Sequence, residues 1–276
     1  MNRLLRILAG LAILVMVLSA AGCNKLMARD QLNKGVKSYK NGRYEEAIAH
    51  FQEAVERDPA LLNARLYLAT AYAQQVTPGA DTPENTRYAN SAIEEYKTVI
   101  TEDPKNSGAI KGIAYLYLQQ KNWEEAKKYY KMAVEVDPND PETYYSVAVI
   151  DWTQSYVPRI QKRSLITDLK PNEPLRPKKD QKLCDELKAG NSAHVEEGMQ
   201  LLQTALQLRP DYDDAMAYLN LLYRERADYT CDDPAARAAD LKTADDWTDK
   251  TLAIKKAKAE KQQGPGGITL DQPQGK

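Results

Sequence analysis

The sequence has very little of three residue types that proteins often use for chemistry or for packing. Among its 276 residues are three Cys, two His and a single Phe, against 17 Tyr. A core of ordinary aromatic packing draws on both Phe and Tyr. The excess of Tyr therefore indicates repeated positions where a ring is buried and its hydroxyl reaches water. His50 and His194 both fall on predicted helices, where we expect them at the surface.

The sequence also lacks a concentrated charge and the short motifs of common enzyme classes. Its formal net charge is −1, and nucleic-acid binders usually carry a strong basic field, so nucleic acid is not an expected partner. There is no Gly-x-x-x-x-Gly-Lys phosphate loop, no His-Glu-x-x-His zinc motif and no Gly-x-Ser-x-Gly nucleophile turn. We expect no enzymatic activity, and hence no catalytic residue, metal or cofactor.

A short apolar run opens the chain. Arg3 and Arg6 precede the run, which extends from Ile7 to Leu18. It is shorter than the ~20 residues of a membrane-spanning helix but suits the core of a signal peptide. The following Ala20-Ala21-Gly22-Cys23 resembles the bacterial lipobox, with Ala where Leu is commonest at its first position. The resemblance implies that residues 1–22 are a signal peptide and that Cys23 is lipidated.

Lipidation would anchor the mature chain to a membrane through a short linker at residues 23–27. Each buried methylene group contributes ~0.8 kcal/mol, so two or more acyl chains hold firmly. In enterobacteria an Asp after the cysteine retains a lipoprotein in the inner membrane, and here Asn24 stands there. The resemblance thus favours the outer membrane, facing the periplasm. Ordinary signal cleavage, with Cys23 a bystander, is the alternative.

The rest of the chain contains an internal repeat. Four segments share a small residue, an aromatic residue or Leu four positions later, Ala or Val three further on, and Pro five after that. Spacings of four and three put these side chains on one helical face, and the proline ends the helix. The segments begin at Ala47, Ala92, Ala126 and Gly198, and their prolines are Pro59, Pro104, Pro138 and Pro210.

A second helix is predicted after each proline. This pattern resembles the tetratricopeptide repeat, a helix–turn–helix unit of ~34 residues. The resemblance implies an all-α fold, a right-handed α-solenoid of about five such units with two insertions, over residues 28–262. The expected units are 28–61, 62–106, 107–140, 141–212 and 213–262, followed by a disordered tail at 263–276.

The spacing of the prolines locates the two insertions. From Pro104 to Pro138 is 34 residues, whereas Pro59 to Pro104 is 45 and Pro138 to Pro210 is 72. The first excess falls near residues 76–83. We interpret the second as one repeat interrupted at about 153–182, because four prolines break helices there. This insertion is basic, and it either contacts anionic lipid or an acidic partner or is a solvated loop.

The resemblance also implies a binding surface, because in tetratricopeptide repeats the first helix of each pair lines a concave groove. Aromatic and aliphatic residues predominate at the matching positions, which favours an extended peptide or an amphipathic helix as ligand. The alternative is that some rings only pack between repeats. The candidate groove residues are Tyr39, Leu66, Tyr67, Lys111, Tyr115, Leu118, Tyr145, Val149, Trp152 and Tyr218.

Two cysteines remain after Cys23. Export places them in an oxidising compartment, where a pair tends to form a disulfide. Cys184 precedes one predicted helix and Cys231 follows the next. Because those helices run antiparallel around Pro210, both cysteines should meet at the same edge, and we predict a disulfide between them.

Taken together, these features predict a non-catalytic scaffold of the bacterial envelope that binds a protein or peptide partner in its groove. The alternative function is that of a carrier for a small hydrophobic or glycan ligand in the same groove.

Overall fold

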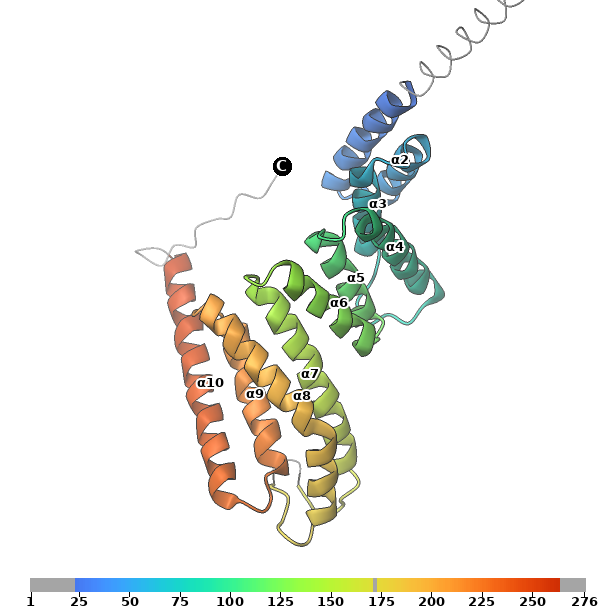
Figure 1. The fold of residues 1–276 in the computed structure, drawn as a ribbon. Coiled ribbons are helices and arrows are strands. Elements are labelled where there is room, and N and C mark those ends of the chain that lie inside the picture. The colour runs from blue at the N-terminus through green and yellow to red at the C-terminus, as the bar shows by residue number, and fades with distance from the viewer. Residues whose placement is uncertain (1–22, 171–172, 264–276) are drawn as a thin grey trace, which may run out of the picture. The chain divides into compact units, whose positions relative to one another are not determined.

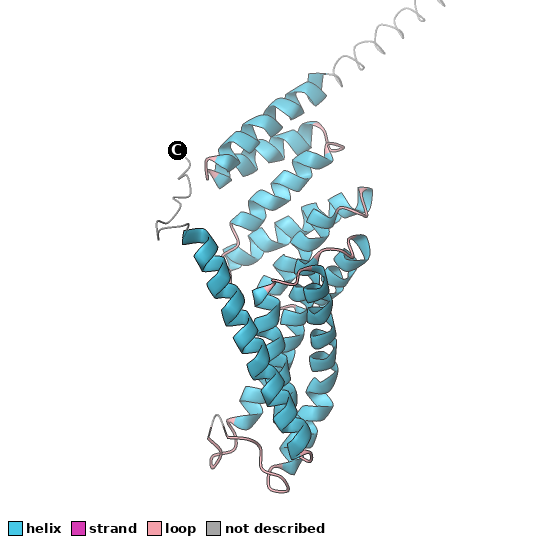
Figure 2. Ribbon diagram, turned by 90° about the vertical axis from the view of Figure 1, so that its left-hand side faces the viewer, coloured by secondary structure: helices cyan, strands magenta, loops and turns pink. Residues whose placement is uncertain are grey.

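The computed structural model describes residues 23–170 and 173–263, and these form helices joined by loops (Figures 1 and 2). No strand occurs in this part of the chain. The chain divides into two compact units, residues 1–136 and 137–276. None of the helices described is long and apolar enough to cross a membrane. The predicted signal peptide, and residues 264–276 of the predicted tail, lie outside the described residues.

In the first unit, helices follow one another along the chain, and each packs against the next (Figure 1). Leu32 and Val36 of the first helix pack with Phe51 of the second. Thr82 and Asn106 cap the starts of two later helices by accepting hydrogen bonds from backbone N–H groups. The helices are residues 23–40, α2 (Tyr44–Arg57), α3 (Leu62–Gln74), α4 (Pro83–Glu102), α5 (Ser107–Gln119) and α6 (Trp123–Val136).

The small and aromatic residues of the repeat are the contact points between these helices. Phe51 lies against Gly35, and Tyr96 lies against Gly112. A Cβ atom at Gly35 would lie 2.4 Å from the Phe51 ring, and one at Gly112 would lie 2.6 Å from the Tyr96 ring. Real Cβ atoms do not come so close to carbon, so these positions need glycine for the rings to fit.

The second unit consists of longer helices, α7 (Pro141–Arg163), α8 (Gln181–Leu208), α9 (Asp213–Tyr229) and α10 (Pro234–Gln263) (Figure 1). Helix α8 packs against α7 and α9, and α10 packs against α9. Leu187, Leu202, Leu219 and Leu222 are almost wholly buried in the shared core. The predicted all-α fold, in which consecutive helices pack side by side, is confirmed within each unit.

The structure corrects two details of the prediction. Helix α7 continues through Pro158 to Arg163, so among the described residues of the second insertion only 164–170 and 173–180 are non-helical. Proline removes one backbone hydrogen bond, but ion pairs of Arg159 and Arg163 with α9 hold the turns beyond it. Residues 23–27 are helical and continuous with residues 28–40, so they do not form the expected linker.

Candidate functional site

The predicted groove residues of the first unit differ in exposure. Tyr67 on α3 and Tyr115 on α5 are each 40% exposed, among the most exposed large apolar side chains of the described residues. The remaining four are half-buried, namely Tyr39, Leu66, Lys111 and Leu118. Helices α3 and α5 contact each other. Two large rings are therefore presented to solvent by neighbouring helices.

Tyr67 is held in place by the core beneath it. Its ring stacks on Phe51, with centroids 5.6 Å apart and planes 20° apart. On the same helix, the Thr70 hydroxyl lies 3.1 Å from the Tyr96 hydroxyl. Burial raises the pKa of Tyr96, so its hydroxyl stays neutral. A ring held by such contacts loses little conformational entropy when it binds a ligand.

The predicted groove residues of the second unit are used for packing among themselves. Tyr218 of α9 meets both Tyr145 and Trp152 of α7 edge to face, with centroids 5.4 and 5.3 Å apart. Trp152 also stacks on Tyr156 at 4.7 Å. Burial raises the pKa of both Tyr145 and Tyr218. These ring contacts fit the alternative that some aromatic positions only pack between neighbouring helices. Val149 on α7 is half-buried. A role of these four residues in binding stays a prediction.

The basic side chains of the second insertion are largely paired within the unit. Arg159 lies 2.9 Å from Glu225 and 3.3 Å from Asp228 of α9. Arg163 is buried and lies 2.8 Å from Asp228. Burial raises the pKa of Glu225 to about 7, against the opposing pull of Arg159. The insertion is thus neither a simple solvated loop nor a free basic patch.

The loop that follows is held in the same way. Arg176 lies 2.7 Å from Asp180 and 3.0 Å from Asp168, and Lys179 also contacts Asp168. Hydrogen bonds from Arg176 and Lys179 hold the pKa of Asp168 well below its usual range. These pairs reduce the positive charge available to an anionic partner, which weakens the case for this loop as a lipid-binding patch.

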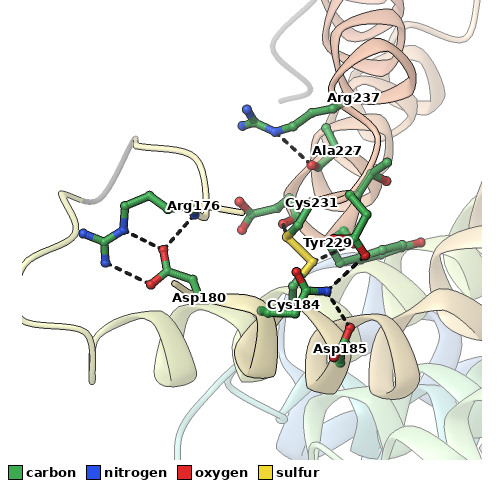
Figure 3. Close-up of a disulfide and its surroundings, with 12 residues drawn as sticks. Arg176, Asp180, Cys184, Asp185, Ala227, Tyr229, Cys231 and Arg237 are labelled. Carbon is green, nitrogen blue, oxygen red and sulfur yellow. Dashed lines mark hydrogen bonds and ion pairs between the residues drawn. A yellow bond between two sulfur atoms is a disulfide. The ribbon is translucent and has the colours of Figure 1, made fainter. Parts of the chain in front are cut away.

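Cys184 and Cys231 form a disulfide in the structure (Figure 3). The Sγ atoms are 2.04 Å apart and the Cα atoms 6.3 Å apart. Both residues are buried. The bridge joins the first turn of α8 to the segment between α9 and α10, where the antiparallel helices place both cysteines. Beside it, the Gln181 amide donates hydrogen bonds to Asp185 and Asp232, both 3.0 Å long.

Both histidines are partly exposed, with 28% of the His50 side chain and 30% of the His194 side chain open to solvent, so the expected surface placement holds in part. His194 Nδ1 lies 3.0 Å from Oδ1 of Asp151, which is wholly buried where the long helix α8 packs against α7. His50 Nδ1 lies 2.7 Å from the side-chain oxygen of Gln31. The Ser155 hydroxyl donates to the backbone oxygen of Asp151. The two histidine contacts join helices, α8 to α7 and α2 to the first helix, whereas the Ser155 hydrogen bond lies within α7. Among the described residues, no group of three or more His, Cys, Asp or Glu could hold a metal ion.

A cavity of about 430 Å³ lies beside the first insertion. Asn85 braces the insertion, because its side chain accepts from the N–H of Thr77 and donates to the carbonyls of Thr77 and Ala80. The sequence did not predict this cavity. It did predict the insertion near residues 76–83, which forms one side of the cavity. The lining includes Val76, Asp81, Asn90, Gln119, Gln120 and Lys121.

Comparisons with known proteins identify the repeat. One family model, described as "Tetratricopeptide repeat", matches residues 89–149, and a second, described as "TPR repeat", matches residues 35–76. The Hsp70-Hsp90 organizing protein of Triticum aestivum is 32% identical over 116 residues, which are 42% of this chain. The match spans only 18% of that relative.

Solved structures share the fold at low sequence identity. The crystal structure of MamA protein is 13% identical, with a TM-score of 0.57, over 85% of this chain and 94% of that one. MamA from Desulfovibrio magneticus RS-1 is 16% identical, with a TM-score of 0.55, over 84% of this chain and 96% of that one. Helix pairs, repeat pattern and family models therefore agree that the chain carries tetratricopeptide repeats, at residues 35–76 and 89–149.

Proposed function

We propose that this chain is a non-catalytic scaffold that binds a protein partner through its first unit. The binding surface, called here the tyrosine face, consists of Tyr67 and Tyr115 with the half-buried Leu66, Lys111 and Leu118. The observation that carries the proposal is the exposure of two rings, 40% each, on the contacting helices α3 and α5. Exposed aromatic residues on a rigid scaffold are typical of binding hot spots.

The chemistry of the tyrosine face indicates the kind of partner. Its rings and leucines offer apolar contact, and each tyrosine hydroxyl adds a hydrogen-bonding group at the rim. A partner helix or extended peptide that presents two apolar side chains would bury both rings. Support comes from the tetratricopeptide repeats that include α3 and α5, since stacked helical repeats offer extended binding surfaces.

Replacing Tyr67 and Tyr115 together with Ala is expected to weaken partner binding about 30-fold to 1000-fold, because each truncated hot-spot ring costs about 1–2 kcal/mol and the pair about 2–4 kcal/mol. The partner would first be identified by crosslinking in the native host, and its dissociation constant then measured with purified proteins. Circular dichroism should show unchanged helicity, since both rings are partly exposed.

Tyr129→Ala is the matched control for this experiment. Tyr129 is half-buried on α6 and stacks on Tyr117, 5.7 Å away, and it is not among the predicted groove residues. The control should bind as the wild type does. If the double variant binds with unchanged affinity, the tyrosine face is not the recognition surface.

We further propose that the scaffold is a lipoprotein of the outer membrane, facing the periplasm. The lipobox-like residues before Cys23 and the signal-like run before them support this location. Cys23 is exposed, with its thiol unpaired, so it is accessible to acylation. The disulfide between Cys184 and Cys231 suits an exported chain, because oxidising compartments favour such bonds.

Cys23→Ser, exported from an ordinary cleavable signal peptide, is expected to move from the membrane fraction to the soluble fraction. The variant has no thiol at position 23 to carry acyl chains, and two or more chains are what hold such a protein firmly. Mass spectrometry of the N-terminal peptide should show acyl groups on wild-type Cys23. Asn24→Ala, made with the native leader, is the control and should stay acylated. A wild-type peptide without acyl groups contradicts the proposal.

A second candidate function is the carriage of a small ligand. The polar cavity beside the first insertion favours it, because neutral amides such as those of Asn90 and Gln120 both donate and accept hydrogen bonds. Such a lining suits a glycan better than a hydrophobic molecule. Mass spectrometry of the native protein separates the two functions. A stoichiometric small molecule supports carriage, and a co-purifying protein that binds the tyrosine face supports the scaffold.

A further inference from the structure

The described part of the first helix begins at Cys23, the proposed point of acylation. Residues 23–40 are helical, with no flexible segment between Cys23 and the first unit. Ala28 and Gly35 are buried in that unit. Acyl chains on Cys23 would therefore be joined to a rigid helix, which fixes the depth of the residues that follow.

The first turn of this helix exposes two large apolar side chains. Leu26 is 71% exposed and Met27 is 46% exposed. They lie three and four positions after Cys23, so all three residues share one face of the helix. On the next turn of this face, Asp30 pairs with Lys34 at 2.6 Å, and both side chains are more than half exposed. The apolar surface thus ends after one turn.

The dimensions of a helix place this turn at the level of a lipid interface. At 1.5 Å per residue, Leu26 lies about 4.5 Å and Met27 about 6 Å along the axis from Cys23. Apolar helix faces settle about 5–10 Å into the boundary between headgroups and acyl chains. Lys25 and Arg29 are exposed on the same two turns, and their charge complements anionic headgroups.

We propose that the first turn of this helix, residues 23–27, is a membrane-contact surface. Leu26 and Met27 enter the lipid interface beside the acylated Cys23, and Asp30 and Lys34 stay in water. The inference rests on the proposed anchoring at Cys23. Acyl chains on this residue would insert into the bilayer, so lipid would lie directly beside this turn of the helix. The contact would hold the first helix in a set orientation on the membrane, as a flexible tether would not.

The test uses one synthetic acyl chain, because one chain binds only marginally and leaves the side-chain contribution measurable. The chain from residue 23 onward is labelled at the Cys23 thiol with a myristoyl maleimide, which the disulfide-bonded Cys184 and Cys231 do not take up. Partition onto vesicles of phosphatidylcholine and phosphatidylglycerol is measured by sedimentation. Leu26→Ser/Met27→Ser should lower the partition coefficient about tenfold or more, since two apolar side chains leave the lipid.

Leu165→Ser is the matched control. Leu165 is 80% exposed but lies in the second unit, and its replacement should leave partition unchanged. Lys25→Gln/Arg29→Gln should lower partition on the anionic vesicles and not on pure phosphatidylcholine. Equal partition of the double serine variant and the wild type would overturn the proposal. Because the acyl chain is attached chemically, this outcome is distinct from a failure of cells to lipidate Cys23.

Discussion

Replacing Cys184 and Cys231 together with Ala is expected to lower the free energy of unfolding of the second unit by about 3–4 kcal/mol. The bridge spans 47 positions of the chain, and closing a loop of that length in the unfolded state accounts for about 4 kcal/mol. Both cysteines are buried, and alanine leaves only a small cavity. Urea denaturation monitored by circular dichroism measures the change in the free energy of unfolding, and calorimetry of thermal unfolding provides a second measurement.

Cys23→Ala is the control, since Cys23 is exposed and forms no disulfide. It should unfold as the wild type does. Reducing the wild-type protein should reproduce the alanine pair, because both treatments release the same loop. If the double variant unfolds at the same urea concentration as the wild type, the disulfide does not limit the conformational entropy of the unfolded chain, and the prediction is wrong.

The disulfide illustrates what the sequence could predict. Its position followed from two facts readable in the chain, the direction of helices on either side of Pro210 and the places of Cys184 and Cys231 within them. The helix pairs were predictable for a similar reason. Small and aromatic residues recur with a helical period, and Gly35 and Gly112 meet the rings of Phe51 and Tyr96 because the repeat puts them face to face.

The second insertion shows where sequence reasoning failed. Its composition is basic, but the acids that pair with Arg159 and Arg163 come from α9, 65 to 69 positions further along. No local pattern reports contacts over that separation. For the same reason Pro158 was a misleading signal. Its effect on the helix is local, whereas the ion pairs that hold the following turns depend on tertiary packing.

For the candidate binding residues, too, the sequence predicted the local features but not those that depend on tertiary packing. Repeat position predicted which helix face carries Tyr67, Tyr115, Tyr145 and Tyr218. It did not predict their exposure, because exposure depends on how neighbouring helices meet. In the second unit α7 and α9 bring Tyr145 and Tyr218 together. On α5, Tyr115 remains 40% exposed, and for this reason the proposed partner surface is placed on the first unit.

The ion pairs between α7 and α9 lead to the second large expected effect. Asp228→Ala should lower the free energy of unfolding of the second unit by about 3–5 kcal/mol, the usual cost of removing one partner from a buried pair. The Arg163 side chain is only 7% exposed, so it would lose the Asp228 carboxylate in a place that water hardly reaches, while it keeps the hydrogen bond that it donates to the backbone oxygen of Glu173. Arg159 would keep Glu225. Asp228→Asn should cost less, because its amide oxygen can still accept a hydrogen bond.

Asp245→Ala separates this effect from the general loss of a charge. Asp245 on α10 lies 2.7 Å from Arg224, and both side chains are well exposed. Exposed pairs contribute about 0–1 kcal/mol, so this control should unfold almost as the wild type does. Urea denaturation of both variants gives the comparison. If Asp228→Ala costs no more than Asp245→Ala, water reaches Arg163 and the pairs do not hold the helical turns beyond Pro158.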